Sequence, residues 1–269
     1  MVKTIFITGA TRGIGRAIAL ALGSLGHQIV VTGKSVSEDP RLGGTIFSVA
    51  AEVKQLGGNA LAIQMDVRSE EQVQSAINTA IENFGGIDVL INNASALFIN
   101  KFEQTPLKKY DLIHQINVRG SFIVTQLALP YLKKGQNPHI ITLAPPLNLH
   151  SKWLASYIPY TLTKYSMSLL ALGWAAEFKT LGIASNTLWP KTLIATQAVN
   201  NNLGGAKTMA GCRKPEIVAD AVKFMMEQPA ANYTSQQLLD EDVLKSSGIT
   251  DFSQYAFQPG QPLIPDIFI

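Results

Sequence analysis

Apolar residues along this chain form six short runs that predict buried β-strands. The runs are continuous, as in Ile29-Val30-Val31 and Val89-Leu90-Ile91, and lack the alternation of a half-exposed strand. Runs of this kind are typical of a parallel sheet that helices cover on both faces. We expect strands at Lys3–Thr8, Gln28–Thr32, Ala60–Met65, Ile87–Ile91, His139–Leu143 and Ile183–Trp189.

Segments with helical spacing separate these strands. Ser69 and Gln72 predict a capping box, Thr105 and Pro106 predict a cap followed by a first-turn proline, and Pro159 fits only in a first turn. The expected helices are Gly13–Leu25, Thr45–Leu56, Ser69 to about Phe84, Pro106–Leu132, Tyr157–Thr180, and one from Lys214-Pro215-Glu216 to Glu227. The alternation predicts an α/β doubly wound parallel sheet, a Rossmann fold, with ligands at the carboxyl ends of the strands.

Three polar or proline-rich stretches lie outside these elements. Ser35–Gly44 is expected to be a long loop, Asn200–Gly205 a mobile segment over the active site, and Gln254–Ile269 an extended tail. No linker or repeat divides the chain, so we expect a single domain over residues 1–269. Residues 1–95 would mainly bind a dinucleotide, 96–253 would form the catalytic and substrate part, and 254–269 the tail.

Composition limits the classes of function. The 269 residues include 22 Lys and Arg against 19 Asp and Glu, with no basic run, which argues against a nucleic-acid partner. Cys212 is the only cysteine and the four histidines are far apart, so we expect no metal site. A strand beginning at Lys3 leaves no room for a signal segment, and no apolar run of about 18 residues could span a bilayer. We expect a soluble, cytoplasmic protein.

A glycine-rich turn between the first strand and the first helix carries the first chemical signal. It reads Thr8-Gly9-Ala10-Thr11-Arg12-Gly13-Ile14-Gly15. Glycines allow a tight turn and let phosphate oxygens approach the N-terminus of the helix, where free N–H groups favour anions. The alternative is a plain strand-to-helix turn.

The end of the second strand indicates which dinucleotide would bind. An acidic residue there would bind the ribose 2′-hydroxyl of NAD, but the chain has Lys34. With Arg12 it could bracket a 2′-phosphate, so we expect NADP rather than NAD. Asp66 follows the third strand and would suit the adenine edge. Lys34 could instead be a solvated loop residue, and Asp66 only a neighbour of a helix cap.

Tyr160 and Lys164 lie four residues apart and therefore share a helix face. An ammonium group near the phenol lowers the pKa of the phenol and can also hold a ribose. Tyr160 would then be the acid for carbonyl reduction or the base for alcohol oxidation. The alternative is an ordinary amphipathic face.

Taken together, these motifs resemble the short-chain dehydrogenase/reductase family. The glycine turn, Asn92-Asn93-Ala94-Ser95, Asn117, Tyr160 and Lys164 follow its order and spacing over nearly the whole chain. The resemblance implies that Asn117 holds a water linking Lys164 to solvent and that the Asn-Asn-Ala segment stabilises the sheet beside the adenine. It also implies a homodimer or homotetramer through the helices from Pro106 and through Tyr160. The implied cofactor contacts are Gly9, Thr11, Arg12, Gly13, Ile14, Gly15, Lys34, Asp66, Val67, Asn93, Ala94, Tyr160, Lys164, Pro190 and Thr192.

Further segments are similar to one subgroup of that family, whose larger members carry an additional C-terminal sterol-carrier domain. These segments are Ala144–Leu149, Trp189–Thr192, Leu203–Gly205, Cys212–Lys214 and Pro259–Asp266. The chain stops before such a domain, so the resemblance implies an isolated dehydrogenase module.

Two positions depart from the family pattern. Where the family has a serine that binds the substrate oxygen, the chain has Ala144-Pro145, which have no side-chain donor. Asn148 first, and Ser151 second, are candidate replacements, although Asn148 could be only a turn residue. Lys191 replaces the usual glycine after Pro190 and would either alter the approach of the cofactor or point to solvent.

Two functions remain open. The first is an NADP-dependent oxidoreductase that acts on a carbonyl or secondary alcohol. Its small-molecule substrate would be lipid-like if the apolar residues Trp153, Leu193, Ile194 and Met209 face it rather than the core. The second is a nucleotide-binding sensor or partner-binding module with little turnover, which the missing serine favours and the Asn117, Tyr160 and Lys164 set opposes.

Overall fold

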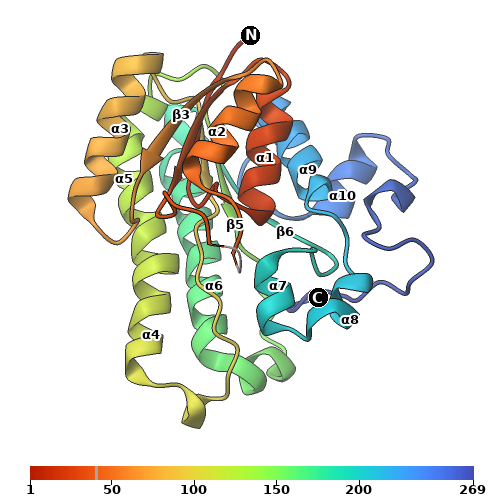
Figure 1. Cartoon of the computed structure of the whole chain (residues 1–269). Helices are drawn as coiled ribbons and strands as arrows, with labels where there is room; N and C mark the ends of the chain where they lie inside the picture. Colours follow the sequence, from red (N-terminus) through yellow and green to blue (C-terminus); the bar gives the residue numbers. More distant parts are fainter. Residues whose placement is uncertain (40–41) are drawn as a thin grey trace.

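A parallel sheet of seven strands forms the centre of the computed structural model, which describes residues 1–39 and 42–269 (Figure 1). The strand order β3-β2-β1-β4-β5-β6-β7 confirms the doubly wound prediction. Six strands lie within two residues of their expected bounds. The strands are β1 (Thr4–Ile7), β2 (Gln28–Gly33), β3 (Asn59–Gln64), β4 (Val89–Asn92), β5 (His139–Leu143), β6 (Ala184–Trp189) and β7 (Gln237–Leu239). The sequence analysis missed β7, because three partly exposed residues give no apolar run.

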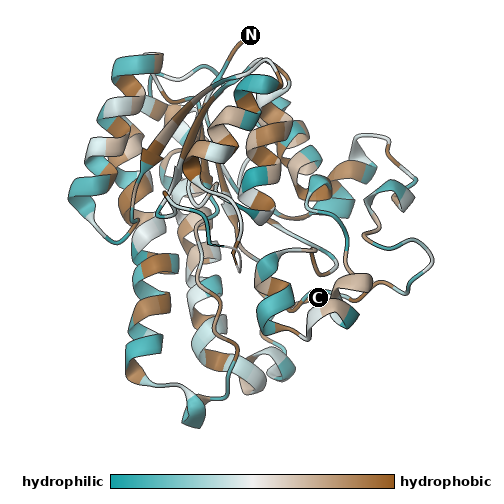
Figure 2. Ribbon diagram, viewed as in Figure 1, coloured by the Kyte–Doolittle hydropathy of each residue, from teal (hydrophilic) through white to brown (hydrophobic). Residues whose placement is uncertain are grey.

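Helices cover both faces of the sheet. They are α1 (Gly13–Gly23), α2 (Ile46–Gln55), α3 (Glu70–Phe84), α4 (Leu107–Ile113), α5 (Gly120–Leu132), α6 (Ser151–Glu177), α7 (Gln197–Asn202), α8 (Gly205–Ala210), α9 (Glu216–Glu227) and α10 (Asp240–Ser246). Short 3-10 turns occur at Phe102–Gln104, Lys179–Leu181 and Ser253–Tyr255. Successive strand residues point to opposite faces, so Ile5 and Ile7 join the core under α1, α2 and α9, whereas Phe6 joins the core under α3 and α5. Figure 2 shows the apolar strands between the two layers of helices.

The long helix expected from Pro106 to Leu132 contains an irregular segment. Between α4 and α5 the chain forms a π-helical stretch at His114–Arg119 that includes the fully buried Asn117. Such bulges often mark functional sites. The expected cap is wrong, because the Thr105 hydroxyl donates to the Lys101 carbonyl at 2.9 Å and Pro106 itself stands at the cap position.

The helix that carries Tyr160 starts earlier than predicted. It begins at Ser151, but Tyr157 has non-helical angles (φ −156°, ψ 52°) that divide it into two pieces. Pro159 therefore lies in the first turn of the second piece, where its missing N–H does no harm. At α3, Ser69 accepts from the Gln72 N–H as expected, but the Gln72 side chain accepts from the Asp66 N–H, so the capping box is only half formed.

The three irregular segments differ in how far they match expectation. The prediction of a loop at Ser35–Gly44 falls partly on residues 40–41, which lie outside the described residues. Asn200–Gly205 includes the end of α7 and the start of α8, beside the site described below. The tail from Gln254 runs back against the body of the protein, and Phe268 is only 2% exposed.

Candidate functional site

A cavity of about 440 Å³ opens at the carboxyl ends of the strands. Its walls include residues that directly follow β1, β2, β3, β4 and β6. The sheet reverses its winding between β1 and β4, and such switch points are where open α/β sheets bind ligands. The predicted residues that line the cavity are Gly9, Thr11, Arg12, Gly13, Ile14, Lys34, Asp66, Val67, Asn93, Ala94, Tyr160, Lys164 and Pro190.

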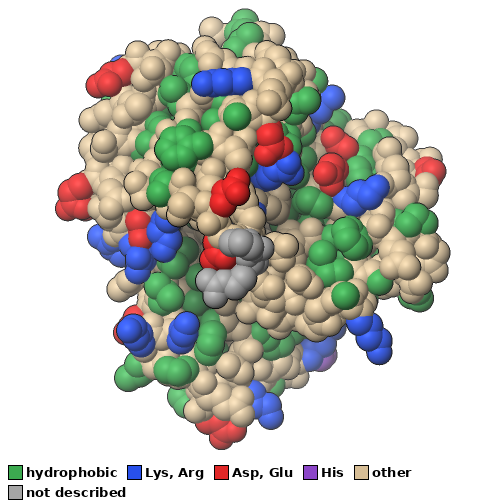
Figure 3. Space-filling view, in the orientation of Figure 1, with side chains coloured by type: hydrophobic (Ala, Val, Ile, Leu, Met, Phe, Trp, Pro, Cys, Tyr) green, Lys and Arg blue, Asp and Glu red, His purple; other side chains and the backbone are tan. Residues whose placement is uncertain are grey.

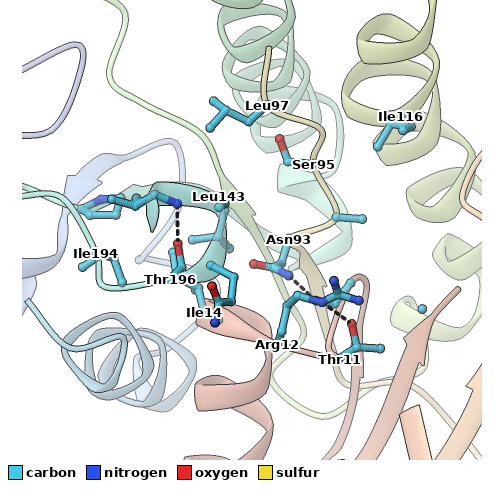
Figure 4. Close-up of a pocket in the computed structure, with 18 of the residues that line it drawn as sticks. Thr11, Arg12, Ile14, Asn93, Ser95, Leu97, Ile116, Leu143, Ile194 and Thr196 are labelled. Atoms are coloured by element: carbon cyan, nitrogen blue, oxygen red, sulfur yellow. Dashed lines mark hydrogen bonds between the residues drawn. The ribbon is translucent and has the colours of Figure 1, made fainter. Parts of the chain in front are cut away.

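The glycine turn has the geometry that a phosphate group requires. Gly9 and Gly13 have positive φ angles of 66° and 53°, which L side chains rarely adopt. A Cβ on Gly15 would lie 2.5 Å from the Asn93 side-chain nitrogen. The N-terminus of α1 has neither a side-chain cap nor an acidic residue in its first turn. This helix begins beside Arg12 and Ile14 in Figure 4, and its free N–H groups therefore fit a pyrophosphate.

Asn93 fastens the glycine turn to the end of β4. Its side-chain amide donates to the carbonyl oxygens of Thr8 (2.8 Å) and Gly9 (3.0 Å). In return, the Thr8 hydroxyl accepts from the N–H groups of Asn93 (3.0 Å) and Ala94 (2.9 Å). These four bonds hold the turn rigid beside the space that a dinucleotide would occupy.

Cationic side chains stand at one rim of the cavity. Lys34 is 60% exposed and its Nζ lies 3.8 Å from Asp66 Oδ2. The Arg12 guanidinium hydrogen-bonds to Thr11 and Ser35. Hydrogen bonds from Arg68 are the largest influence that lowers the pKa of Asp66, and Lys34 adds to it. Lys34 and Arg12 therefore place two cations on separate loops at this rim, beside the ionised Asp66, and this arrangement suits a charged group of a ligand. Basic and acidic side chains are interspersed on the face of the molecule shown in Figure 3.

Tyr160 and Lys164 lie on the opposite side, from the second piece of α6. Lys164 is 2% exposed, and its Nζ donates to the Leu143 carbonyl at 2.8 Å at the end of β5. It also lies 3.4 Å from Ser95 Oγ and 5.1 Å from the centre of the Trp189 ring. Burial lowers the pKa of Lys164 to about 7 and raises the pKa of Tyr160. Lys164 can therefore change protonation state near neutral pH, whereas Tyr160 stays protonated unless a partner stabilises its phenolate.

Asn117 is placed by the π-helical stretch and holds the active-site loop after β4. Its side-chain oxygen accepts from the Ala96 N–H at 2.7 Å. Its amide donates to the Ala96 carbonyl (3.1 Å) and to the Thr163 hydroxyl (3.0 Å). Asn117 thus joins this loop to the residue before Lys164.

The two candidate substitutes for the absent serine lie away from the cavity. The Asn148 side-chain oxygen accepts from the His150 N–H at 3.0 Å, as a turn residue does. Ser151 is the exposed first residue of α6. Neither is among the described residues that line the cavity, whereas Ser95 is an exposed hydroxyl on its wall. The sequence analysis quoted Ser95 only as part of a motif and assigned it no role.

The remaining predicted residues differ in whether they line the cavity. The Thr192 hydroxyl is buried and has no partner among the described residues, and Thr192 is not among the residues that line the cavity. Lys191 forms an ion pair with Glu241 at 3.0 Å and is not among the residues lining the cavity. Of the apolar residues considered for a lipid, Leu193 and Ile194 line the cavity, whereas Trp153 and Met209 pack in neighbouring clusters.

The tail contributes a wall that the sequence did not predict. Asp266 and Ile267 line the cavity together with Tyr160 and Lys164. The Phe268 ring lies 6.4 Å from the Tyr160 ring, centre to centre, at an angle of 21°. A proline-rich stretch gave no signal that its last residues return to the active site.

Comparisons with known proteins identify the family of this chain. A family model described as short chain dehydrogenase matches residues 3–204. The chain belongs to the short-chain dehydrogenase family. This membership confirms the resemblance noted in the sequence and makes the chain a family oxidoreductase. The family binds a nicotinamide cofactor, and the residues around the cavity fit such a group.

Individual relatives and solved structures show which family members this chain resembles. Hydroxysteroid dehydrogenase-like protein 2 is 49% identical in Danio rerio and 45% in Homo sapiens, in each case over 99% of this chain and 63% of the relative. The chain therefore spans somewhat less than two thirds of these relatives. A putative dehydrogenase from Xanthomonas campestris is 48% identical with a TM-score of 0.96, covering 99% of this chain and 97% of that one. A blue fluorescent protein from a metagenomic library in complex with NADPH is 26% identical with a TM-score of 0.76, covering 88% and 95%.

Two further properties concern metals and membranes. Among residues 1–39 and 42–269, no group of three or more His, Cys, Asp or Glu side chains could hold a metal ion. Within the same residues, no helix is both long and apolar enough to cross a bilayer.

Proposed function

We propose that this chain is an NADP-dependent oxidoreductase that interconverts a carbonyl and a secondary alcohol, with Tyr160 as general acid and base. The observation that carries the proposal is that Tyr160 and Lys164 line the same cavity as the glycine turn. When bound, NADP(H) supplies or accepts the hydride. In reduction, Tyr160 gives its phenolic proton to the carbonyl oxygen, and in oxidation the phenolate takes the alcohol proton.

Lys164 supports Tyr160 in this proposal. An ammonium group near the phenol favours the phenolate and lowers the pKa that burial raises. The Leu143 carbonyl fixes the ammonium at 2.8 Å, and Asn117 fixes the loop that carries Ser95. Lys164 would also hold the nicotinamide ribose, while Pro190 and Thr192 would contact the nicotinamide end.

The preference for NADP rests on the cations at the opposite rim. Lys34 and Arg12 follow the ends of β2 and β1 and can contact a 2′-phosphate. The metagenomic blue fluorescent protein, whose structure contains NADPH, supports a phosphorylated cofactor in this fold. Asp66 is ionised here but is engaged by Arg68 and Lys34, so those cations partly cancel its repulsion of the phosphate.

The substrate class follows from the remaining walls. Aliphatic side chains dominate them, namely Leu97, Ile116, Leu143, Leu193, Ile194, Val199 and Leu203. Such a lining favours an apolar, lipid-like carbonyl compound. The α7 and α8 region, which supplies Val199 and Leu203, would cover this substrate.

Titration of the protein with NADP(H) and NAD(H) by calorimetry tests this proposal, followed by turnover assays on fatty aldehydes and ketosteroids. We expect tighter binding of NADP(H) and NADPH-dependent reduction of at least one apolar carbonyl. Binding without turnover on any carbonyl would instead favour the nucleotide-binding module. Ala144 and Pro145 favour that second candidate, because they leave the position directly after β5 without a side-chain donor.

A homodimer or homotetramer is part of the proposal. Phe122 on α5 and Leu162 and Leu169 on α6 are 44%, 43% and 58% exposed. These apolar side chains on adjacent helices are suited to meet a second copy of the chain. Light scattering coupled to gel filtration measures the mass directly.

A further inference from the structure

The last residues of the chain are held against the loop that follows β6. Backbone hydrogen bonds run from the Leu193 N–H to the Ile264 carbonyl (2.9 Å) and from the Asp266 N–H to the Lys191 carbonyl (3.1 Å). The Trp189 indole donates to the Ile267 carbonyl at 3.0 Å. The segment from Ile264 to Ile267 is therefore a fixed part of the cavity wall.

Phe268 anchors this segment. Its ring is surrounded by five aromatic rings with centres 5.3 to 6.4 Å away, which belong to Trp153, Tyr157, Tyr160, Tyr165 and Trp189. Burial of the ring in this cluster fixes the segment, even though Phe268 has a positive φ of 75°, which L residues rarely adopt. Asp266, two residues earlier, is thereby held in place.

Asp266 is the acidic group that this anchor brings to the reacting end of the cavity. It lines the cavity with Tyr160 and Lys164 and is partly exposed to it. One of its oxygens accepts from the Ile267 N–H at 2.7 Å. In the part of the chain that the structure describes, no cation lies within 4.0 Å of the Asp266 carboxyl. A carboxyl group in such a place is stabilised in its neutral form.

The surroundings of Asp266 support a neutral carboxyl. Burial raises its pKa to about 8, against the opposing effects of the Ile267 N–H and the Lys164 ammonium. The titratable groups facing it come from three elements: Tyr157, Tyr160 and Lys164 on α6, Cys212 before α9, and Asp240 at the start of α10. Asp240 adds to the rise, because a second carboxylate nearby disfavours ionisation.

We propose that Asp266, as a neutral carboxylic acid, donates a hydrogen bond to the substrate oxygen in place of the serine that the chain lacks after β5. The inference rests on the proposed function. During reduction the carbonyl oxygen accepts this bond while it takes its proton from Tyr160, and Asp266 keeps its own proton throughout. A carboxylic acid in an apolar pocket can stabilise developing negative charge in this way.

Two substitutions test the donor by its chemistry. Asp266→Asn keeps an N–H donor of similar size, whereas Asp266→Ala removes it. We expect kcat/KM for carbonyl reduction to fall by about 10²-fold or more in Asp266→Ala and by much less in Asp266→Asn. Asp251→Asn, at an exposed carboxylate, is the matched control. An equal loss in both Asp266 variants, or no loss in Asp266→Ala, would overturn the proposal.

The pH profile gives a second readout that a structural role would not move. With its pKa raised to about 8, the carboxyl should carry its proton and donate below that pH, and ionise and repel the oxyanion above it. Lys164, whose pKa is about 7, titrates in both proteins, so wild-type reduction should show an additional decline above pH about 8 that Asp266→Asn lacks. A cofactor affinity that falls in Asp266→Ala while kcat stays constant would assign Asp266 to the cofactor instead, and would overturn the proposal.

Infrared spectroscopy separates this inference from the proposed function, because it needs no turnover. The difference spectrum between wild type and Asp266→Asn should contain the C=O band of a protonated carboxyl at neutral pH, which disappears at higher pH. Absence of the band at neutral pH would overturn the inference even if the enzyme is active. Presence of the band in a protein that reduces no carbonyl would confirm the neutral acid and reject the proposed function.

Discussion

The ammonium nitrogen of Lys164 lies 3.4 Å from the hydroxyl oxygen of Ser95. Ser95 follows β4 and Lys164 belongs to α6, so the contact joins two walls of the cavity. The Ser95 hydroxyl also lowers the pKa of Tyr160, opposing part of the rise that burial causes. We therefore expect Ser95 to be a positioning residue for the proposed acid–base pair of Tyr160 and Lys164.

Ser95→Ala should move the pH dependence of alcohol oxidation upward. Without the hydroxyl, the pKa of Tyr160 rises further, so the phenolate that accepts the alcohol proton forms only at higher pH. We expect the rising limb of kcat/KM to move to higher pH. Ser95→Thr should restore the wild-type profile. An unchanged profile in Ser95→Ala would show that the hydroxyl does not act on Tyr160.

Tyr160→Phe keeps the ring against Phe268 and removes only the transferable proton. Turnover should fall by about 10²-fold or more, while cofactor affinity changes little. Lys164→Ala should weaken both, because the ammonium would contact the ribose as well as stabilise the phenolate. Steady-state kinetics and calorimetry on the same preparations measure the two effects. Full activity in Tyr160→Phe would reject the assigned role.

Asn148→Ala and Ser151→Ala should each leave the reduction rate close to wild type, far from the 10²-fold to 10³-fold loss typical of a missing oxyanion donor. The reason is their position, since the Asn148 side chain accepts from the His150 N–H and Ser151 is exposed. Steady-state kinetics of the two single variants measure whether either side chain contributes to the reduction rate. A large loss in either would restore the loop after β5 as the source of the donor.

Lys34→Ala should weaken NADP binding by roughly tenfold, about 1.4 kcal/mol, and leave NAD binding nearly constant. Lys34 is 60% exposed and pairs only loosely with Asp66, so its charge is free to turn toward a 2′-phosphate. Lys54→Ala, an exposed lysine in the last turn of α2, is the control for net charge. Equal losses for both cofactors would argue against recognition of the phosphate by Lys34.

Buried strands and the glycine turn could be predicted because each depends on local sequence. Continuous apolar runs placed six strands within two residues, and glycines at Gly9, Gly13 and Gly15 marked a turn whose shape requires them. The π-helical stretch around Asn117 could not be predicted, because the residues there have ordinary helical spacing and the irregularity comes from packing. The same holds for β7, whose three residues are ordered only by pairing with β6.

The active-site role of the tail depends on contacts that are distant in sequence. Asp266 lines the same cavity as Lys164 although about a hundred residues separate them in sequence, and nothing within the Pro259–Asp266 segment indicates that Phe268 enters an aromatic cluster. Likewise, Asn148 was a candidate donor from its place after β5, but its side-chain oxygen accepts from the His150 N–H and the residue is not among those that line the cavity. Local hydrogen bonds of this kind compete with function and only the fold decides between them.

Glu241 should be important for stability, not for chemistry. It lies at the start of α10 and accepts from Lys191 (3.0 Å), Lys245 (3.1 Å) and the buried Arg213. Burial opposes its ionisation, but these three hydrogen bonds prevail and lower its pKa to about 2. Glu241→Gln would leave the Arg213 guanidinium, which is 7% exposed, without its charged partner. We expect a loss of about 3 kcal/mol in the free energy of unfolding at neutral pH, measured by urea denaturation.

The pH dependence of this loss follows from the sign of the shift. Because the pKa of Glu241 is lower in the folded state, its contribution is complete above the usual value of 4.5 and disappears as the pH falls toward about 2. The difference between wild type and Glu241→Gln should therefore shrink on acidification through that window. Asp242→Asn, on the neighbouring carboxylate that is 56% exposed, should change stability by less than about 0.5 kcal/mol at any pH. A wild-type advantage that persists undiminished at the acid end would mean that packing, and not the charge of Glu241, stabilises this end of α10.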